Sequence, residues 1–406
     1  MKDNQAKYPQ LRFKGFTDPW EKRSLDEITT KTKSYSLSRD VERDHETGYR
    51  YIHYGDIHTG VADIVTEHTN LPNIEPANYD ELRVNDLVVA DASEDYQGIA
   101  EPAVVVGLPT QHLVAGLHTI ALRPSSASSL YLYYLLHTES FKHFGYQTGT
   151  GLKVFGISWS NLSKFTFMIP SRPEQEKIVK LIESVDNLTS DNQRKLAKLK
   201  ELKQGYLQKL FPKNGSKFPQ LRFAGFADDW EERKLGDITK ISTGKLDANA
   251  MVENGKYDFY TSGIKKYRID VAAFEGPSIT IAGNGATVGY MHLADNKFNA
   301  YQRTYVLQEF LVDRSFIFSE IGNKLPKKIK QEARTGNIPY IVMDMLTELK
   351  VSIPQNDTEQ KKIGDFFKQL DDTIALHQRK LEKLQELKKG YLQKLFPKNG
   401  SKFPQL

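Results

Sequence analysis

Two long tracts with the same spacing of apolar residues dominate the hydrophobic pattern of this chain. Apolar side chains recur at steps of three and four from Glu174 to Phe211, and again from Glu359 to Phe396. Such spacing over about five heptads is typical of helices that pack along one face in a coiled coil. At about 1.5 Å per residue, each tract predicts a helix about 57 Å long. The predicted seam positions are Ile178, Leu181, Val185, Leu188, Leu199, Leu202 and Tyr206 in the first tract, and Ile363, Phe366, Leu370, Leu384, Leu387 and Tyr391 in the second.

Each tract carries the sequence signals of a helix start and a helix end. A strand-like alternation of apolar and polar residues precedes each tract and ends at a proline, and a capping residue with a glutamate three positions later follows. A second proline then stops the helix. The residues that carry these signals are Pro170, Ser171, Glu174 and Pro212 in the first copy, and Pro354, Asn356, Glu359 and Pro397 in the second.

One polar residue interrupts the seam of each tract near its midpoint, Asn192 in the first and His377 in the second. If the two helices pack antiparallel about a pseudo-two-fold axis, their midpoints meet. These two side chains would then face each other and fix the register of the helices. The alternative is that the seam rotates at this point and leaves both side chains in solvent.

The tracts belong to a wider internal duplication. The match continues into KNGSKFPQL, so that 200–221 and 385–406 differ only at Lys200 and Gln204 of the first copy. A leading segment also occurs twice, as 8–29 and 218–239, and the chain ends at 402–406 in the start of a third. Two copies are too few for a solenoid and predict a pseudo-two-fold protein instead. We expect a quasi-circular chain, with 8–13 packed at the end of the second helix and 403–406 left loose.

The segments between the leading segments and the helices, about 30–168 and 240–352, share little sequence. Both contain short β-rich runs separated by turn residues, such as DLVVADAS and HTIALRP in the first and SITIAGNG in the second. Each also has an amphipathic helical stretch, near 130–144 and 316–329. The sequence therefore predicts the α+β fold class, with two α+β domains built on one plan and each followed by a long helix.

The composition excludes several classes of protein. The chain has 39% hydrophobic residues, 26% charged residues and no cysteine, which is typical of a globular protein and excludes disulfides and cysteine-bound zinc. No run approaches the roughly 20 apolar residues of a membrane span, and the polar start MKDNQAKYPQ is not a signal peptide, so we expect a cytoplasmic protein without membrane contact. The net charge of +5 resides in the two helical tracts, so bulk charge gives little support for nucleic-acid binding.

The motifs of the obvious enzymes are missing from the sequence. There is no Pro-Pro pair, which the target-gripping loop of an amino-methyltransferase requires, and no phosphate-binding ATPase loop. The glycines around Asn284 predict a turn, and Asp344, Glu348 and Lys350 predict a structural strand rather than a nuclease site. The histidines lack metal-binding spacing. We therefore expect no catalytic residues, no cofactor and no metal in this chain.

Two unlike domains, each followed by a copy of one long helix that opens with Glu-Gln and closes in L-x-x-G-Y-L-Q-K-L-F, resemble the specificity subunit of type I restriction–modification enzymes. The W-x-x-x-x-L-x-x-I motifs at Trp20 and Trp230 and the Ile-Pro and Glu-Gln pairs at each helix start carry this resemblance across the whole chain. It implies two globular α+β target recognition domains separated by two long antiparallel coiled-coil helices. Each domain would recognise one half of a bipartite double-stranded DNA site, and the coiled coil would fix the gap between the half-sites.

The resemblance also implies the partners and the domain limits. Two modification subunits would bind S-adenosylmethionine and methylate adenine, restriction and translocase subunits would use ATP and magnesium, and this chain would be a non-catalytic subunit. The alternative function is a coiled-coil interaction scaffold with two ligand-binding domains and no DNA. The implied segments are a first recognition domain at 1–170, a first spacer helix at 171–211, a second recognition domain at 212–355, a second spacer helix at 356–397, and a tail at 398–406.

Candidate DNA contacts follow from the chemistry of loop residues. Basic side chains suit phosphates, whereas amide, hydroxyl, imidazole and carboxylate groups suit base edges. The first domain is acidic near its predicted loops, at Asp91, Glu94, Asp95 and Glu101, and these groups could accept hydrogen bonds from cytosine amino groups. The second has two basic runs, for which a solvated surface is the alternative. The predicted DNA-binding residues are Tyr54, Asp56, His58, Ser93, Gln97, Thr150 and Lys153 in the loops 54–59, 93–97 and 148–153, and Lys265, Lys266, Tyr267, Arg268, Lys324, Lys327, Lys328, Lys330, Arg334 and Asn337 in the second domain.

Overall fold

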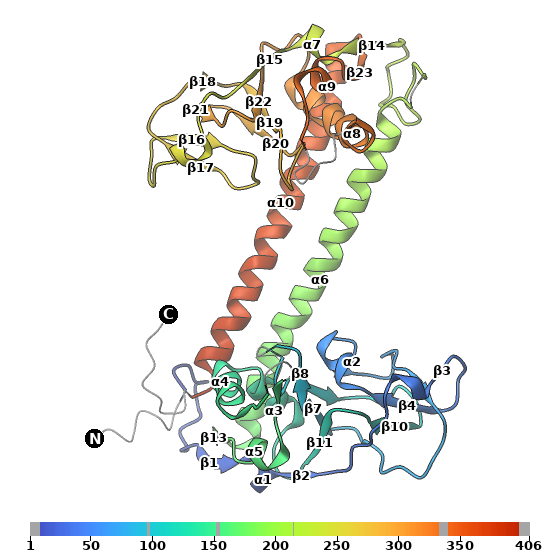
Figure 1. Cartoon of the computed structure of the whole chain (residues 1–406), viewed down its shortest axis with the longest axis vertical. Helices are drawn as coiled ribbons and strands as arrows, with labels where there is room; N and C mark the ends of the chain where they lie inside the picture. Colours follow the sequence, from blue (N-terminus) through green and yellow to red (C-terminus); the bar gives the residue numbers. More distant parts are fainter. Residues whose placement is uncertain (1–8, 96–97, 152–154, 214, 333–339, 398–406) are drawn as a thin grey trace. The chain divides into compact units, whose positions relative to one another are not determined.

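The computed structural model describes residues 9–95, 98–151, 155–213, 215–332 and 340–397. The chain divides into two compact units. The first comprises the described residues up to Asp191 together with those from Leu381, and the second comprises Asn192–Lys380. Each unit contains one α+β domain and one half of each long helix (Figure 1). The predicted α+β fold class, with two domains and two long helices, is therefore confirmed.

The two long helices are α6 (Arg172–Leu210) and α10 (Asp357–Lys394). Within each unit their halves pack side by side and antiparallel. In the first unit Lys388 Nζ lies 2.7 Å from a carboxylate oxygen of Asp186, and in the second Lys203 Nζ lies 2.5 Å from Asp371. The two contacts join equivalent positions of the duplicated helix.

The predicted seam is correct at one set of positions and displaced at the other. Ile178, Val185, Ile363 and Leu384 are buried as predicted. Leu188, Leu202 and Leu387 were wrongly assigned, because their side chains are 51%, 42% and 42% exposed. Buried residues of the helices that were not predicted include Ile182 and Phe367, each one position after a predicted seam residue, and Leu196. Leucines beside the seam thus imitate seam residues at the level of sequence.

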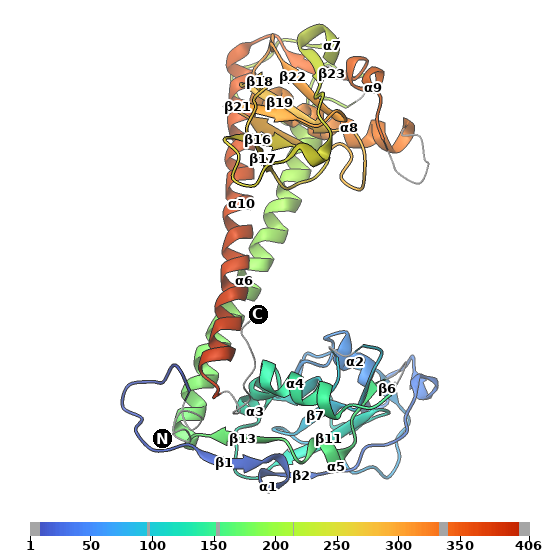
Figure 2. The ribbon, with the colours of Figure 1, turned by 60° about the vertical axis from the view of Figure 1, so that its left-hand side comes forward.

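The first domain contains two larger sheets and two strand pairs. One sheet has the order β2-β11-β7-β9-β5, the other β10-β4-β6-β3, and the pairs are β1·β13 and β8·β12. Both views place α2 and α5 on opposite sides of this domain (Figures 1 and 2). The elements are β1 (Glu21–Ser24), α1 (Leu25–Ile28), β2 (Thr29–Lys31), β3 (Glu42–Arg43), β4 (Tyr49–Ile52), α2 (Tyr54–His58), β5 (Ile64–Val65), β6 (Asn73–Ile74), β7 (Leu87–Ala90), β8 (Ala92–Ser93), β9 (Pro102–Val105), β10 (His112–Ala115), β11 (Thr119–Pro124), α3 (Ser129–Leu136), α4 (Glu139–Thr148), β12 (Phe155–Gly156), α5 (Trp159–Leu162) and β13 (Thr166–Ile169), with a short 3-10 turn at Arg39–Val41.

The second domain repeats this plan with fewer strands. Its sheets have the orders β15-β22-β19-β20 and β17-β16-β21-β18, and β14 pairs with β23. The elements are β14 (Trp230–Lys234), α7 (Leu235–Ile238), β15 (Lys240–Thr243), β16 (Tyr257–Tyr260), β17 (Tyr267–Ile269), β18 (Phe274–Glu275), β19 (Ser278–Ala282), β20 (Met291–Ala294), β21 (Lys297–Ala300), β22 (Thr304–Gln308), α8 (Arg314–Glu332), α9 (Met343–Thr347) and β23 (Lys350–Pro354), with a 3-10 turn at Ala248–Ala250.

A junction at the start of each long helix holds the leading segment in place. Glu174 is buried and accepts two hydrogen bonds from Arg12, at 2.8 and 2.9 Å. Glu359 accepts two from Arg222, at 2.7 and 2.8 Å. The side chain of the glutamate that follows each predicted cap is therefore the acceptor of a half-buried arginine. The predicted cap at Asn356 is also formed, because its side-chain oxygen accepts from Thr358 N (2.9 Å) and Glu359 N (3.3 Å).

The glutamine after each of these glutamates joins the helix start to the domain. Gln175 donates to Pro170 O (2.9 Å) and accepts from Ser128 N (2.8 Å) at the start of α3. Gln360 donates to Pro354 O (3.0 Å) and accepts from the backbone N–H before α8, at Asp313 (2.9 Å). The Glu-Gln pair of each tract thus connects the leading segment, the closing strand, the domain and the long helix.

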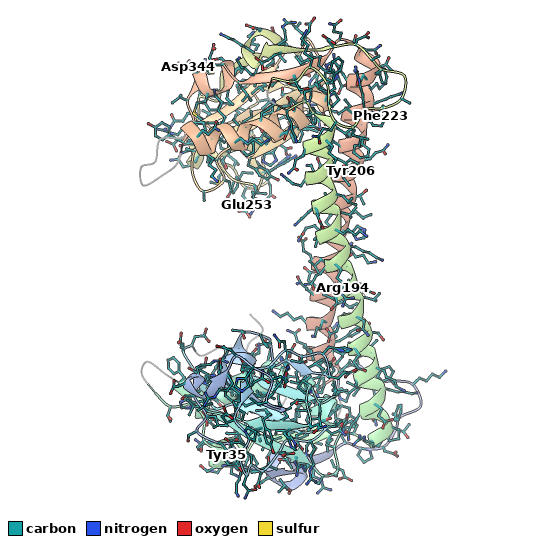
Figure 3. All side chains as sticks on the ribbon, turned by 90° about the vertical axis from the view of Figure 1, so that its right-hand side faces the viewer. Tyr35, Arg194, Tyr206, Phe223, Glu253 and Asp344 are labelled. Carbon is teal, nitrogen blue, oxygen red and sulfur yellow. The ribbon has the colours of Figure 1, made fainter. Side chains whose placement is uncertain are left out.

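The leading segments also close onto the far ends of the helices. In the first unit Leu11 N donates to Lys394 O at 2.9 Å, and in the second Leu221 N donates to Lys209 O at 2.8 Å. The expected packing of 8–13 against the end of the second helix holds for the described part of that segment. Tyr8 and Phe403–Leu406 lie outside the described residues. In the second unit the rings of Tyr206 and Phe223 both pack on Phe366, with centroids 5.0 and 6.2 Å away (Figure 3).

Candidate nucleic-acid interface

The three segments selected in the first domain lie together. His58, at the end of α2, places Nε2 2.8 Å from Ala92 O. Strand β8 pairs with β12, Ser93 opposite Phe155, and Thr150 N donates to Gly156 O at 2.9 Å. An unbroken series of contacts therefore connects the segments around residues 58, 93 and 150 into one surface. Gln97 and Lys153 lie outside the described residues.

This surface contains a cleft of about 530 Å³ whose walls carry three carboxylates, those of Glu94, Asp95 and Glu101. Nδ1 of His58 lies 3.1 Å from a carboxylate oxygen of Glu101. This hydrogen bond raises the pKa of His58 above its usual value. Thr150 lies on the exposed part of the same surface. The residues that line the cleft are Tyr54, Gly55, His58, Thr59, Ser93, Glu94, Asp95, Gly98, Glu101 and Lys142.

Two details of the first-domain selection require correction. Residues 54–58 form helix α2 and not the predicted loop. Asp56 is buried, because its carboxylate accepts from His53 N (2.9 Å) at the start of that helix and from Arg39 (2.8 Å). Ser93 is also buried, and its hydroxyl accepts from Asp95 N at 3.3 Å. Asp56 and Ser93 therefore shape the surface, while Tyr54, His58 and Thr150 line or border it.

Loops converge in the same way in the second domain. The hydroxyl of Ser262, which follows β16, donates to the side chain of Asn284, and Thr287 donates to Ser262 O. Asn284 is also bridged to Tyr340. The loop after β16, the loop after β19 and the segment that begins at 340 thus form one surface. Ser262, Asn284 and Thr287 were not selected from the sequence, although the resemblance of DLVVADAS to SITIAGNG, each a strand followed by a polar turn, is a signal that could have found them.

The basic run at 265–268 divides into exposed and anchored residues. Lys265 and Lys266 are exposed, and their Nζ atoms lie 5.5 and 5.3 Å from the ring centroids of Tyr267 and Tyr260. Arg268 instead donates to Gly255 O (3.0 Å), to Lys256 O (2.7 Å) and to Asp258. Arg268 therefore supports the loop, Lys266 lies 3.9 Å from the carboxylate of Asp258, and Lys265 is exposed.

The basic helix α8 divides similarly. Lys324 is only 14% exposed and lies 3.9 Å from the carboxylate of Glu320, which is fully buried. Lys327 and Lys330 are exposed and Lys328 is half-buried. A Cβ on Gly289, whose φ is +84°, would lie 2.5 Å from Ile329 Cδ1, so α8 runs close against the loop after β19. Arg334 and Asn337 lie outside the described residues.

Asn192 and His377 meet within the second unit. Asn192 Nδ2 donates to His377 O (2.8 Å), and the side-chain oxygen of Asn192 lies 2.7 Å from His377 Nδ1. Asn192 is 3% exposed, so the solvated alternative does not apply to it. The tautomer with hydrogen on Nδ1 satisfies both contacts.

The described part of the chain contains neither a cluster of metal ligands nor a membrane-spanning helix. There, three or more potential metal-ligating side chains never cluster closely enough to hold an ion. Among the helices described, none is long and apolar enough to cross a membrane. Glu348 of the suspected nuclease motif pairs with Lys234 at 2.6 Å. The strand predicted for this motif is correct only for Lys350 on β23, because Asp344 lies in helix α9 and Glu348 directly follows that helix.

The model of the family described as "Type I restriction modification DNA specificity domain" matches residues 17–204 and 227–386. The two matches cover most of the chain and one domain each. The chain belongs to this family. The family assignment inferred from the repeats is thereby confirmed.

Relatives and solved structures agree with the assignment. The chain is 34% identical over 174 residues to the EcoDI specificity subunit of Escherichia coli, an alignment that covers 42% of this chain and 38% of that relative. It is 24% identical over 400 residues to the MjaX specificity subunit of Methanocaldococcus jannaschii, covering 92% of this chain and 91% of that protein. The crystal structure of an S subunit from M. genitalium superposes with a TM-score of 0.67 at 18% identity and covers 96% of this chain and 99% of that one, which establishes the shared fold. A second structure, from a study of type I R-M complex assembly, gives a TM-score of 0.54 at 15% identity over 93% and 97% of the two chains.

Proposed function

We propose that this chain is the DNA-reading subunit of a type I restriction–modification complex and that each domain reads one half of a bipartite site. The observation that carries the proposal is the convergence of three segments into one polar surface in each domain. Both surfaces lie at the ends of equivalent strands, and each consists of residues suited to contact base edges or phosphates. Two such surfaces on one chain match a site with two separately specified halves.

The duplicated helices suit the role of spacer. The buried Asn192 and the half-buried His377 form a polar pair within the seam, an arrangement that fixes the register of paired helices. A fixed register sets a fixed distance, and two readers on one face of a duplex require half-sites about one helical turn, near 34 Å, apart. We infer that the helices define the length of the unread gap.

Catalysis belongs to partner subunits in this proposal. Two modification subunits would supply S-adenosylmethionine-dependent adenine methylation, and restriction and translocase subunits would supply ATP- and magnesium-dependent cleavage. The sequence lacks the motifs of these reactions, which supports this division. The same division of labour places the chain in the cytoplasm with its DNA substrate.

The decisive test reconstitutes the chain with modification subunits and maps the adenines methylated in a random DNA library. We expect two short half-sites separated by a gap of constant length. Adding one heptad to both helices should lengthen the gap and leave both half-sites unchanged. Methylation without a bipartite motif would favour the scaffold function instead. So would a complex that assembles but does not bind DNA.

A further inference from the structure

Backbone hydrogen bonds establish residue-by-residue equivalence between the two diverged domains. Asp91 N donates to His118 O at 3.0 Å in the first domain, and Gly283 N donates to Arg303 O at 2.8 Å in the second. Asp91 O in turn accepts from the N–H of residue 157 (2.8 Å), as Gly283 O does from that of residue 341 (2.9 Å). Asp91 therefore corresponds to Gly283, and His118 corresponds to Arg303.

In the first domain this pair of positions lies beside the surface around Tyr54 and His58, and Asp91 lines a neighbouring cleft of about 1140 Å³ together with Thr119 and Trp159. His118 Nδ1 lies 3.1 Å from the carboxylate of Asp91, and the ring of Tyr54 packs against His118 with centroids 5.3 Å apart. Both members remain partly exposed, at 49% for His118 and 32% for Asp91. The carboxylate of Asp91 is thus an exposed hydrogen-bond acceptor beside the surface proposed to read bases.

In the second domain the same positions carry the opposite chemistry. A Cβ at Gly283 would lie 2.3 Å from Arg303 O, so this frame position admits only glycine and can hold no carboxylate. Arg303 is exposed and lines a cleft of about 440 Å³ together with Gln302 and Tyr340. Tyr340 is the residue bridged to Asn284, so the cleft adjoins the converged loops.

The guanidinium of Arg303 is also available. Among the described residues, none forms a hydrogen bond or ion pair with it. Two other arginines of this domain are held, Arg222 by Glu359 and Arg314 by Ser278 O, Ala294 O and Asp295. An exposed arginine in the turn directly before β22, with its backbone oxygen bonded to Gly283 N and next to a surface of converged loops, is placed for bidentate donation to guanine O6 and N7.

We propose that Arg303 reads a guanine in the half-site of the second domain, while the equivalent position of the first domain, Asp91 beside His118, reads a base with an exocyclic amino group. This assignment rests on the proposed function and names the chemistry of its two surfaces. At the base pair next to these equivalent positions, one half-site would then present hydrogen-bond acceptors to Arg303, and the other would present a hydrogen-bond donor to Asp91.

The test compares methylation motifs of the complete complex carrying single variants. Arg303→Ala should lower the preference for guanine at one position of one half-site by about ten-fold or more, and leave the other half-site unchanged. Arg303→Lys keeps the charge but not the rigid fork of donors, so its preference for guanine should fall between those of wild type and Arg303→Ala, while the salt dependence of binding stays as in wild type. Asp91→Asn should change the other half-site. Arg233→Ala, an exposed arginine on β14, is the matched control and should change neither.

Each result bears on the assignment. An unchanged motif with Arg303→Ala would overturn base reading by this residue, and weaker binding to all sequences with an unchanged motif would indicate a phosphate contact instead. A change in the same half-site by Asp91→Asn and Arg303→Ala would overturn the division between domains. Retention of the other half-site in each variant is also the check that the protein is folded. If the wild-type complex selects no bipartite site, the proposed function itself fails.

Discussion

The two halves of the chain differ least where they join the helices and most where they face a ligand. At the junctions, Glu174 and Glu359 bind their arginines with nearly identical distances, and Lys177 and Lys362 each lie 5.0 Å from the ring centroid of a phenylalanine in the leading segment. At the converged surfaces, the first domain is acidic and rich in histidine, whereas the second is basic. The contrast shows that the contacts which join each domain to the helices are kept in both copies, whereas the exposed side chains of the converged loops differ between them.

One difference also exists inside the duplicated junction. Trp20 Nε1 donates to Glu174 at 3.2 Å, whereas the buried Trp230 Nε1 has no hydrogen-bond partner among the described residues. A buried donor without an acceptor costs about 1–3 kcal/mol. The second junction is therefore expected to be the weaker of two otherwise equivalent structures.

The largest expected effect tests the equivalence of the junctions. Glu359→Ala leaves Arg222, only 14% exposed, without its carboxylate and should destabilise the second unit by about 3–5 kcal/mol. Glu174→Ala should cost the first unit at least as much, because Trp20 also loses its acceptor. Urea denaturation of the full chain measures both losses against Glu231→Ala on the exposed face of β14. A loss near that of the control in either unit would show that the junctions are not equivalent.

The next effect concerns a buried carboxylate of the second domain. Burial raises the pKa of Glu320 from 4.5 to about 7. Between about pH 4.5 and pH 7 the folded chain therefore retains a proton that the unfolded chain has lost. The free energy of unfolding should fall as pH rises through this window, by about 3 kcal/mol in all, and level off above it.

Glu320→Gln should remove that dependence, and thermal unfolding at a series of pH values measures it. The exposed Glu348 provides the control, since Glu348→Gln should leave the pH profile of wild type intact. A Glu320→Gln profile that still declines between pH 4.5 and pH 7 would assign the titration to another group.

The sequence predicted the elements whose cause is local and missed those whose cause is distant. The heptad spacing and the prolines located α6 and α10, and turn residues located the strands. The seam was displaced at Leu188, Leu202 and Leu387, because a leucine signals burial equally well on either side of a seam. Asp56 was selected as a loop carboxylate, although the cap of α2 and Arg39 bury it. Arg303 was missed because its place beside Gly283 arises only from strand pairing.

A smaller effect sharpens the comparison at the middle of the helices. Asn192→Ala should cost about 1–3 kcal/mol, since it leaves the imidazole of His377 without its buried partner. Replacing both residues by leucine removes the unpaired group and should be close to neutral or stabilising. Thermal unfolding of Asn192→Leu, His377→Leu and the double variant measures the coupling. If the polar pair also fixes register, the double variant should methylate sites with more than one gap length, whereas a single gap length would limit the pair to a role in stability.

The smallest expected effect separates phosphate contacts from base contacts on the two surfaces. Lys327 and Lys330 are exposed on α8, and each phosphate contact that is lost should reduce the slope of log binding constant against log salt by about 0.9. Lys327→Ala and Lys330→Ala should therefore weaken binding of the complex to all sequences alike and leave the methylation motif unchanged. Lys240→Ala is the control, because its ammonium pairs with Glu309 on the surface of the same domain. Glu94→Gln in the acidic cleft of the first domain should change the motif and leave the slope as it is, since a carboxylate contacts bases and not phosphates. An unchanged slope in the lysine variants would place α8 away from DNA and leave the loops after β16 and β19 as the contact surface of the second domain.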